Sequence, residues 1–213
     1  QIAYVMLHVH YIALIETTES EDDADCSLLG VYMEDGEDEG IYTTKDSEIR
    51  RIARLYKRRI TYKEFQEMMY IMREVKRCSE RNLIAVNNGI FNFDTKKLMP
   101  FTPDKVFTSK SRVDYNPNAK NVVIHNDEDG TDWDVESWMD TLSDDKGVVT
   151  ILWQVLGATI RPNVSWNQAC FMYSESGNNG KGTLCVLMRQ LVGEGRYASI
   201  PLKDFGKDFM LEP

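Results

Sequence analysis

Residues 169–192 constrain the fold of this chain more than any other stretch. An apolar and aromatic segment comes first, a loop rich in Gly and Asn with a single lysine follows, and apolar residues at helical spacing end the stretch. A strand, a glycine-rich loop and a helix in this order are the context that a phosphate-binding loop needs. In such a loop, backbone N–H groups and the helix N-terminus hold the phosphates.

The residues predicted to bind nucleotide phosphates are those of this loop: Gly177, Asn178, Asn179, Gly180, Lys181, Gly182 and Thr183. Gly177 and Gly180 permit backbone angles and a close approach that a Cβ would block, and Lys181 would reach the outer phosphates. Glu175 and Gly182 depart from the strict pattern, which has Gly and Ser or Thr there. Thr183 is therefore the predicted substitute ligand for magnesium. The alternative is a loop that merely precedes a helix, with Lys181 in solvent.

The composition is that of a globular chain of 213 residues, of which 42% are hydrophobic. No apolar run approaches the ~20 residues needed to cross a bilayer, so no membrane partner is expected. The N-terminus lacks the pattern of a signal peptide and an initiator Met, which indicates a piece of a longer protein. The cysteines lack Cys-x-x-Cys spacing, which argues against disulfides and zinc, and Cys170 and Cys185 are expected in the core.

The net charge of −9 is unevenly distributed. Residues 1–44 contain eleven acidic residues and no Lys or Arg, whereas residues 45–81 contain twelve Lys or Arg against six Asp or Glu. Between residues 114 and 145 ten acidic residues face only Lys120. The basic stripe within 45–81 could contact nucleic-acid phosphates. Because no interleaved aromatic residues are evident, a solvated face, or one that meets an acidic patch, is the preferred interpretation.

Helices and short strands are expected to alternate in the first two thirds of the chain. A short helix that runs into a strand is one possibility for residues 2–15, and a hairpin is predicted for 28–43. An antiparallel meander is predicted for 83–101, followed by an extended segment at 106–115. Further helices are predicted at 47–59, at 61–77 with a Thr61–Glu64 capping box, at 133–142 and at 146–156. Trp133, Trp138 and Trp153 are expected to pack between the last two.

Seven segments together resemble one family: 40–43, 87–94, 100–103, 115–119, 156–157, 179–183 and 200–205. In this order they look like segments of the phage and plasmid primase–helicases, whose motor is a superfamily 3 helicase. Poxvirus primase–helicases are distant relatives of that group. The resemblance covers nearly the whole chain, and its weight comes from the order of the segments.

The resemblance implies an α+β domain, with helices and a small antiparallel sheet, over residues 1–145. The start of a P-loop α/β (AAA+-like) ATPase core would follow over residues 146–213. The implied function is that of a fragment of a replicative DNA helicase that hydrolyses ATP to unwind DNA. ATP and Mg²⁺ are the implied cofactors, and single-stranded DNA is the implied partner of the complete motor. The implied assembly is a ring, commonly a hexamer, in the cytoplasm of a bacterial host.

Hydrolysis also needs an acidic residue on a later strand and usually an arginine from a neighbouring subunit. The family order places these catalytic residues beyond Pro213, so the fragment alone is expected to hydrolyse ATP poorly. A second hypothesis is a non-catalytic interaction or oligomerisation module with a vestigial loop, which Glu175 and Gly182 favour. A small-molecule P-loop kinase fits less well, because about 170 residues precede the loop.

Overall fold

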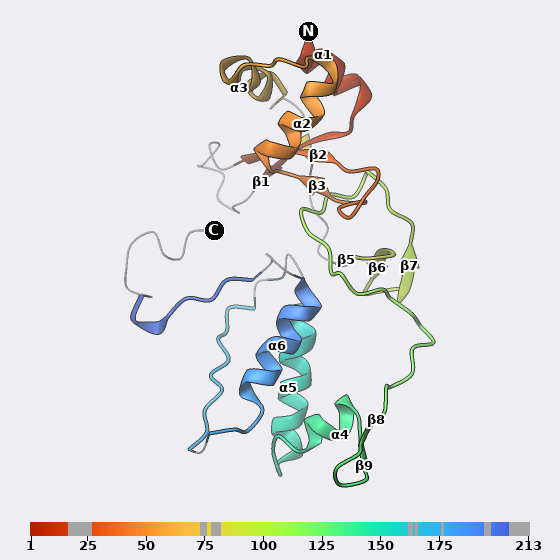
Figure 1. The fold of residues 1–213 in the computed structure, drawn as a ribbon, viewed down its shortest axis with the longest axis vertical. Helices are drawn as coiled ribbons and strands as arrows, with labels where there is room; N and C mark the ends of the chain where they lie inside the picture. Colours follow the sequence, from red (N-terminus) through yellow and green to blue (C-terminus); the bar gives the residue numbers. More distant parts are fainter. Residues whose placement is uncertain are drawn as a thin grey trace.

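The computed structural model describes residues 1–16, 27–72, 76–77, 82–161, 164, 166–175, 177–193 and 197–204. The described residues form an α+β arrangement with small, mainly antiparallel sheets and six α-helices. Figure 1 shows the N-terminal helices and a sheet at one end, a second sheet in the middle, and the helices within residues 135–192 at the other end. The expected combination of helices with small antiparallel sheets is therefore confirmed.

The N-terminal sheet has four strands in the order β3-β2-β1-β4. Strand β1 (Ile12–Glu16) pairs antiparallel with β2 (Ser27–Tyr32), and β2 pairs antiparallel with β3 (Tyr42–Thr43). Alternate side chains of a strand point to opposite faces. Ile12 accordingly packs with the helices, whereas Ala13 packs with Tyr42 on the other face.

Three helices cover the face of this sheet that carries Ile12: α1 (Ile2–Val9), α2 (Asp46–Tyr56) and α3 (Tyr62–Met72). Helix α3 begins at the predicted capping box, in which the Thr61 N–H donates to Glu64 Oε2 at 3.0 Å. Met68 and Met72 are buried in the shared core. The predicted extension of this helix to residue 77 is wrong, because Lys76–Arg77 forms β4, whose backbone pairs with β1 in parallel.

The second sheet is the predicted meander of β5 (Leu83–Val86), β6 (Gly89–Asn92) and β7 (Lys97–Met99). The expected extended segment 106–115 forms no strand of its own. It joins the two sheets instead, since the Tyr42 N–H donates to the Phe107 carbonyl and the Ser111 N–H donates to the Ala85 carbonyl. A core of Ile41, Leu83, Ala85, Ile90 and Phe107 fills the space between them.

A short hairpin of β8 (Ile124–Asn126) and β9 (Thr131–Trp133) precedes the remaining helices and was not predicted. Its signal was the acidic turn that ends at Gly130, whose φ is +71°. The helices are α4 (Val135–Asp140), α5 (Lys146–Thr159) and α6 (Lys181–Val192). Trp133 belongs to β9, and both it and Trp153 are exposed, so the predicted packing between two helices is wrong for these two tryptophans. Trp138 lies in α4 and is half-buried.

Two smaller expectations can be compared with the structure. Cys170 is exposed and Cys185 is half-buried, so the predicted core position is wrong for Cys170. Cys26 and Cys78 lie outside the described residues. Among the described helices, none has the length and apolar character that crossing a membrane requires.

Candidate functional site

The predicted phosphate loop lies directly before and within the first turn of α6. Gly177, Asn178, Asn179 and Gly180 form the loop, and Lys181, Gly182 and Thr183 begin the helix. Ser176 lies outside the described residues. The structure therefore keeps all seven predicted residues together at one helix N-terminus.

The backbone turns into α6 through two residues with positive φ. Asn178 has φ +56° and Gly180, the N-cap residue, has φ +80°. Asn tolerates this left-handed region better than most residues, and Gly enters it without a steric cost. A Cβ at Gly180 would also overlap Leu142 Cδ2 and lie 3.4 Å from Trp138 Cζ2. Glycine at this position is thus required by both the backbone and the packing.

The other two glycines of the loop are not constrained in this way. A Cβ at Gly177 or Gly182 would meet no heavy atom within 4 Å, and neither residue has a positive φ. The expectation that Gly177 is needed for its backbone angles is therefore not met. The open space at Gly182 also means that packing does not explain the absence of Ser or Thr there.

The N-terminus of α6 offers backbone donors without a helical acceptor. No described side chain caps it, and the first helical hydrogen bond runs from the Leu184 N–H to the Gly180 carbonyl at 2.9 Å. The N–H groups of the preceding turn consequently have no acceptor within the helix. Together with the positive end of the helix dipole, such donors favour an anion.

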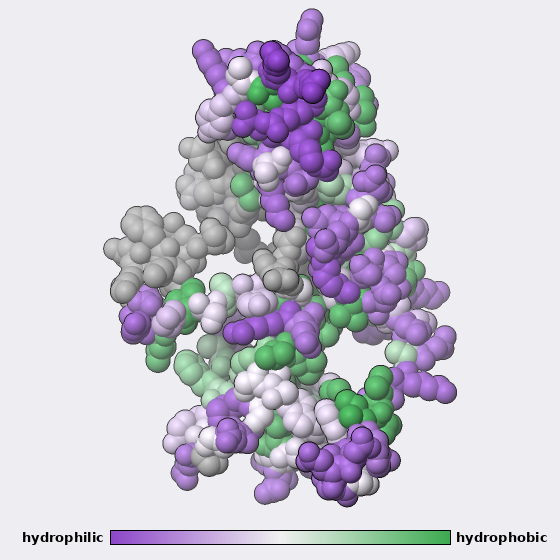
Figure 2. Space-filling model, in the orientation of Figure 1, coloured by the Kyte–Doolittle hydropathy of each residue, from purple (hydrophilic) through white to green (hydrophobic). Residues whose placement is uncertain are grey.

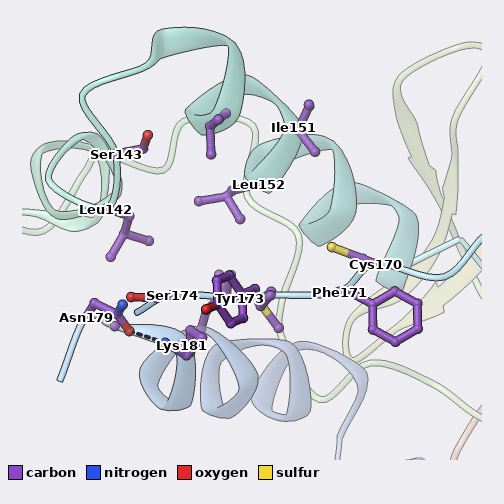
Figure 3. Close-up of a pocket in the computed structure, with 14 residues that line it drawn as sticks. Leu142, Ser143, Ile151, Leu152, Cys170, Phe171, Tyr173, Ser174, Asn179 and Lys181 are labelled. Carbon is purple, nitrogen blue, oxygen red and sulfur yellow. Dashed lines mark hydrogen bonds between the residues drawn. The ribbon is translucent and has the colours of Figure 1, made fainter. Parts of the chain in front are cut away.

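Lys181 is positioned at this turn by its neighbour in the loop. Its Nζ donates to Asn179 Oδ1 at 2.5 Å, and the lysine is half-buried (Figure 3). An amide oxygen is a neutral acceptor, so an anion at the loop would be a stronger partner for the ammonium group. Thr183 is exposed in the first turn, with its hydroxyl available to a ligand.

A cavity of about 420 Å³ opens beside the loop. Its apolar wall comes from α5, through Val148, Ile151 and Leu152, while Ser174, Asn179 and Lys181 form a polar end (Figure 3). Cavities that hold small molecules commonly combine an apolar wall with a few polar groups in this way. None of the described lining residues is Asp or Glu. The described lining therefore offers apolar and polar groups for binding.

The segment before the loop differs from the expectation. The apolar and aromatic residues 169–174 were predicted to form a strand, and the structure assigns none there. Phe171 and Tyr173 are 85% and 84% exposed. A strand requires hydrogen bonds to a neighbouring strand, and no described segment pairs with this one. An α/β core with a strand leading into the loop is thus not formed by the described residues.

The packing of Gly180 against α4 and the α5 wall of the cavity were missed by the sequence analysis. Leu142 and Trp138 lie about 40 residues before the loop, and no local pattern marks them as its neighbours. Nothing in the described part of the chain groups three His, Cys, Asp or Glu side chains as a metal site. Thr183 consequently remains the predicted metal-binding residue, through the nucleotide.

The far end of α6 is attached to the segment that joins the two sheets. Ser111 Oγ donates to the Leu191 carbonyl at 2.6 Å, which satisfies a carbonyl of the last helical turn. Gly193 follows the helix with φ +90°, and a Cβ there would lie 3.3 Å from Arg112 Cγ. The helix that begins at the loop thus ends against the α+β region.

Comparison with known proteins gives one informative result. No curated protein matches the chain. A family model described as "D5 N terminal like" matches residues 22–144, which is more than half of the chain. Domains of this family occur in phage and viral primase–helicase proteins. The match includes the N-terminal β2, both α2 and α3, the meander and α4, and it ends before the loop. The chain therefore belongs to the D5 N-terminal-like family.

Proposed function

We propose that the chain is part of a replicative DNA helicase or primase–helicase of a phage or another mobile element. The complete protein would bind and hydrolyse ATP with Mg²⁺ to unwind DNA, with a superfamily 3 motor and distant poxvirus relatives. Family membership supports the type of protein. The observation that carries nucleotide binding is the position of Lys181 behind the left-handed Gly180 at the N-terminus of α6.

Residues 1–145 would be the domain that precedes the motor, and residues 146–213 would begin the motor itself. In this proposal the loop N–H groups and Lys181 bind the outer phosphates, with Lys181 moving from Asn179 to the phosphate. Thr183 would help to hold Mg²⁺, and the apolar wall formed by α5 would cover part of the nucleotide. The residues that catalyse hydrolysis would be supplied from outside the described lining of the cavity, which contains no Asp or Glu. Self-association into a ring, commonly a hexamer, and translocation on single-stranded DNA complete the proposal.

The first test is the affinity of the chain for a fluorescent ATP analogue with Mg²⁺, for wild type and Lys181→Ala. We expect Lys181→Ala to weaken binding roughly tenfold or more, because a charge-assisted contact to phosphate contributes on the order of 1.5–3 kcal/mol. Lys203→Ala, which removes an exposed lysine outside the loop, is the matched control. Equal affinity of the wild type and Lys181→Ala, with unchanged circular dichroism, would contradict the assignment.

A second candidate is an interaction or oligomerisation module with a vestigial loop. Gly182 in place of the usual hydroxyl residue favours it, as does the absence of a strand before the loop. Sedimentation velocity with and without ATP separates the two proposals. Association that depends on ATP supports the helicase, whereas association without any nucleotide binding supports the module.

A further inference from the structure

The C-terminal half of α2, the turn after it and the start of α3 up to Lys63 form a basic surface. Residues 50–63 contain seven Lys or Arg and no Asp or Glu, although the chain as a whole carries a net charge of −9. Figure 2 shows strongly hydrophilic residues gathered over this end of the molecule. The members of this basic surface that are exposed are Arg51, Arg54, Lys57, Arg58, Arg59 and Lys63.

Most of these cations have no acidic partner among the residues that the structure describes. Arg51 pairs with Glu48 at 2.9 Å and Lys57 pairs with Glu64 at 2.6 Å. Across the described ranges, Arg54, Arg58, Arg59 and Lys63 form no ion pair. Unpaired charges of one sign produce a local potential that acts within a Debye length of about 8–10 Å. The overall negative charge of the chain therefore does not cancel the field at this surface.

Aromatic side chains are interleaved with the basic ones, which corrects the sequence-based interpretation that none are. Tyr62 and Tyr70 are 67% and 76% exposed and have no described aromatic or cationic ring contact. They lie eight residues apart on α3 with Gln66 between them, so both are on the same face, next to Lys63. Eight residues of helix span about 12 Å, which is too far for one base to contact both rings.

The surface is held in place by contacts beneath it. Lys57 Nζ bridges to Glu64 Oε1 and Arg50 Nη2 donates to the Ile60 carbonyl at 3.3 Å, which ties the turn to both helices. Ile49, Ile52, Phe65 and Met68 anchor the inner faces of α2 and α3 in one core. The cations and the tyrosines are thus presented on a rigid support before any ligand arrives.

We propose that this basic surface binds single-stranded nucleic acid, with the four unpaired cations on its phosphates and Tyr62 and Tyr70 stacked on its bases. Backbone cations combined with exposed aromatic rings are the features by which proteins hold single strands without reading their sequence. The proposed function is the reason for choosing DNA as the ligand, so the inference rests on it in this respect. Binding at the basic surface does not require a nucleotide at the loop. This surface adds a strand-binding site on the domain that precedes the motor.

The competing occupant is a second copy of the chain. Residues 127–145 carry nine of the ten acidic residues between residues 114 and 145. They lie in the turn after β8, in β9, in α4 and in the turn after α4, at the opposite end of the molecule (Figure 1). A contact between these two ends would be head-to-tail. Such a contact would use the cations but not the exposed tyrosines, which is why the single strand is favoured.

The test is the anisotropy of a fluorescein-labelled oligothymidylate of about 20 nucleotides, titrated with the full chain without ATP over a range of salt concentrations. Arg54→Ala/Arg58→Ala/Lys63→Ala should weaken binding at least about tenfold and reduce the salt slope of log K by about two. Lys97→Ala/Lys120→Ala/Lys203→Ala removes the same charge from exposed sites elsewhere and should leave binding unchanged. Tyr62→Ser/Tyr70→Ser should weaken binding about fivefold or more, and Tyr62→Phe/Tyr70→Phe should restore it.

Three outcomes would overturn the proposal. The wild type could fail to bind the oligonucleotide, both triple variants could bind it equally, or the basic-surface triple variant could lose self-association in sedimentation velocity without any change in oligonucleotide affinity. The last outcome would make the surface a contact between copies. The ATP affinity of the same variants is measured in parallel. If Lys181→Ala binds the oligonucleotide normally but the wild type fails to bind ATP, the proposed function fails and the strand-binding site stands.

Discussion

At the scale of the residue, the loop before α6 shows which side chains the fold itself requires. Gly180 is demanded by its positive φ and by Leu142, whereas Gly182 lies in open space at the first helical turn. Lys181 already has a neutral partner in Asn179. Packing therefore does not explain why residue 182 is a glycine. The missing hydroxyl at this position matters for the binding of magnesium, which is tested next.

Thr183→Ala should abolish any gain in nucleotide affinity that Mg²⁺ provides, because Thr183 is the hydroxyl left in the first turn of α6. Adding Gly182→Ser should restore that gain, and it should also favour the helix by roughly half a kcal/mol. The measurement is a titration with the fluorescent ATP analogue in Mg²⁺ and in EDTA. A Thr183→Ala protein that retains the full Mg²⁺ effect would remove Thr183 from the metal site.

At the scale of the element, a helix with a capping side chain begins at a position that nearby residues in the sequence determine. Helix α3 begins where Thr61 and Glu64 exchange hydrogen bonds, and α4 begins where Asp134 accepts from the Ser137 N–H at 2.7 Å. Hydrogen bonds from Lys57 and from Thr61 hold the pKa of Glu64 at about 2, below its ordinary value of 4.5. Hydrogen bonds from Ser137 likewise lower the pKa of Asp134.

Glu64→Gln should flatten the acid dependence of stability. Because the pKa of Glu64 is lower in the folded chain, its stabilising contribution is present above about pH 4.5 and is lost as the pH falls towards 2. Thermal unfolding followed by circular dichroism between pH 2 and 7 should show a steeper fall in Tm for wild type than for Glu64→Gln. Glu67→Gln, an exposed position of the same helix, is the control and should follow the wild type. Parallel curves for the wild type and Glu64→Gln would contradict this account of the cap.

At the scale of the whole molecule, the segment 106–115 connects regions that are distant in sequence. Lys110 Nζ donates to the Glu39 carbonyl at 2.9 Å, and Arg112 Nη2 lies 2.7 Å from Asp38 Oδ1. Burial, and then the nearby charge of Arg112, lower the pKa of the Lys110 ammonium group. Ser111, between them, holds the last turn of α6. One short segment thus ties the hairpin of β2 and β3 to the helix that starts at the loop.

Ser111→Ala should destabilise the chain by about 1 kcal/mol, because it leaves the Leu191 carbonyl without its donor. The backbone amides near the C-terminal end of α6 should exchange hydrogen faster, while those of α3 should not change. Denaturant unfolding and hydrogen exchange measure the two effects. Ser109→Ala, a half-buried serine two residues earlier without a described side-chain hydrogen bond, is the matched control. Equal exchange in both variants would show that Ser111 does not hold the helix.

The sequence by itself determined the features that depend on adjacent residues. The capping box of α3, the meander around Gly89 and the start of a helix at the Gly-rich loop were all predicted correctly. The hydrogen bonds and backbone angles that define these features lie within a few residues of one another. The residues predicted to bind nucleotide are likewise contiguous, and their binding stays a prediction.

Only the tertiary structure decided where segments distant in sequence meet. Lys76 and Arg77 form a strand because β1 offers them a backbone partner, and residues 166–174 form none because no described strand lies beside them. Trp153 and Tyr70 are exposed although both stand in helices with apolar stripes. Burial and strand pairing depend on the segment that packs against a residue or strand. When that segment is distant in sequence, the local pattern does not predict where it lies.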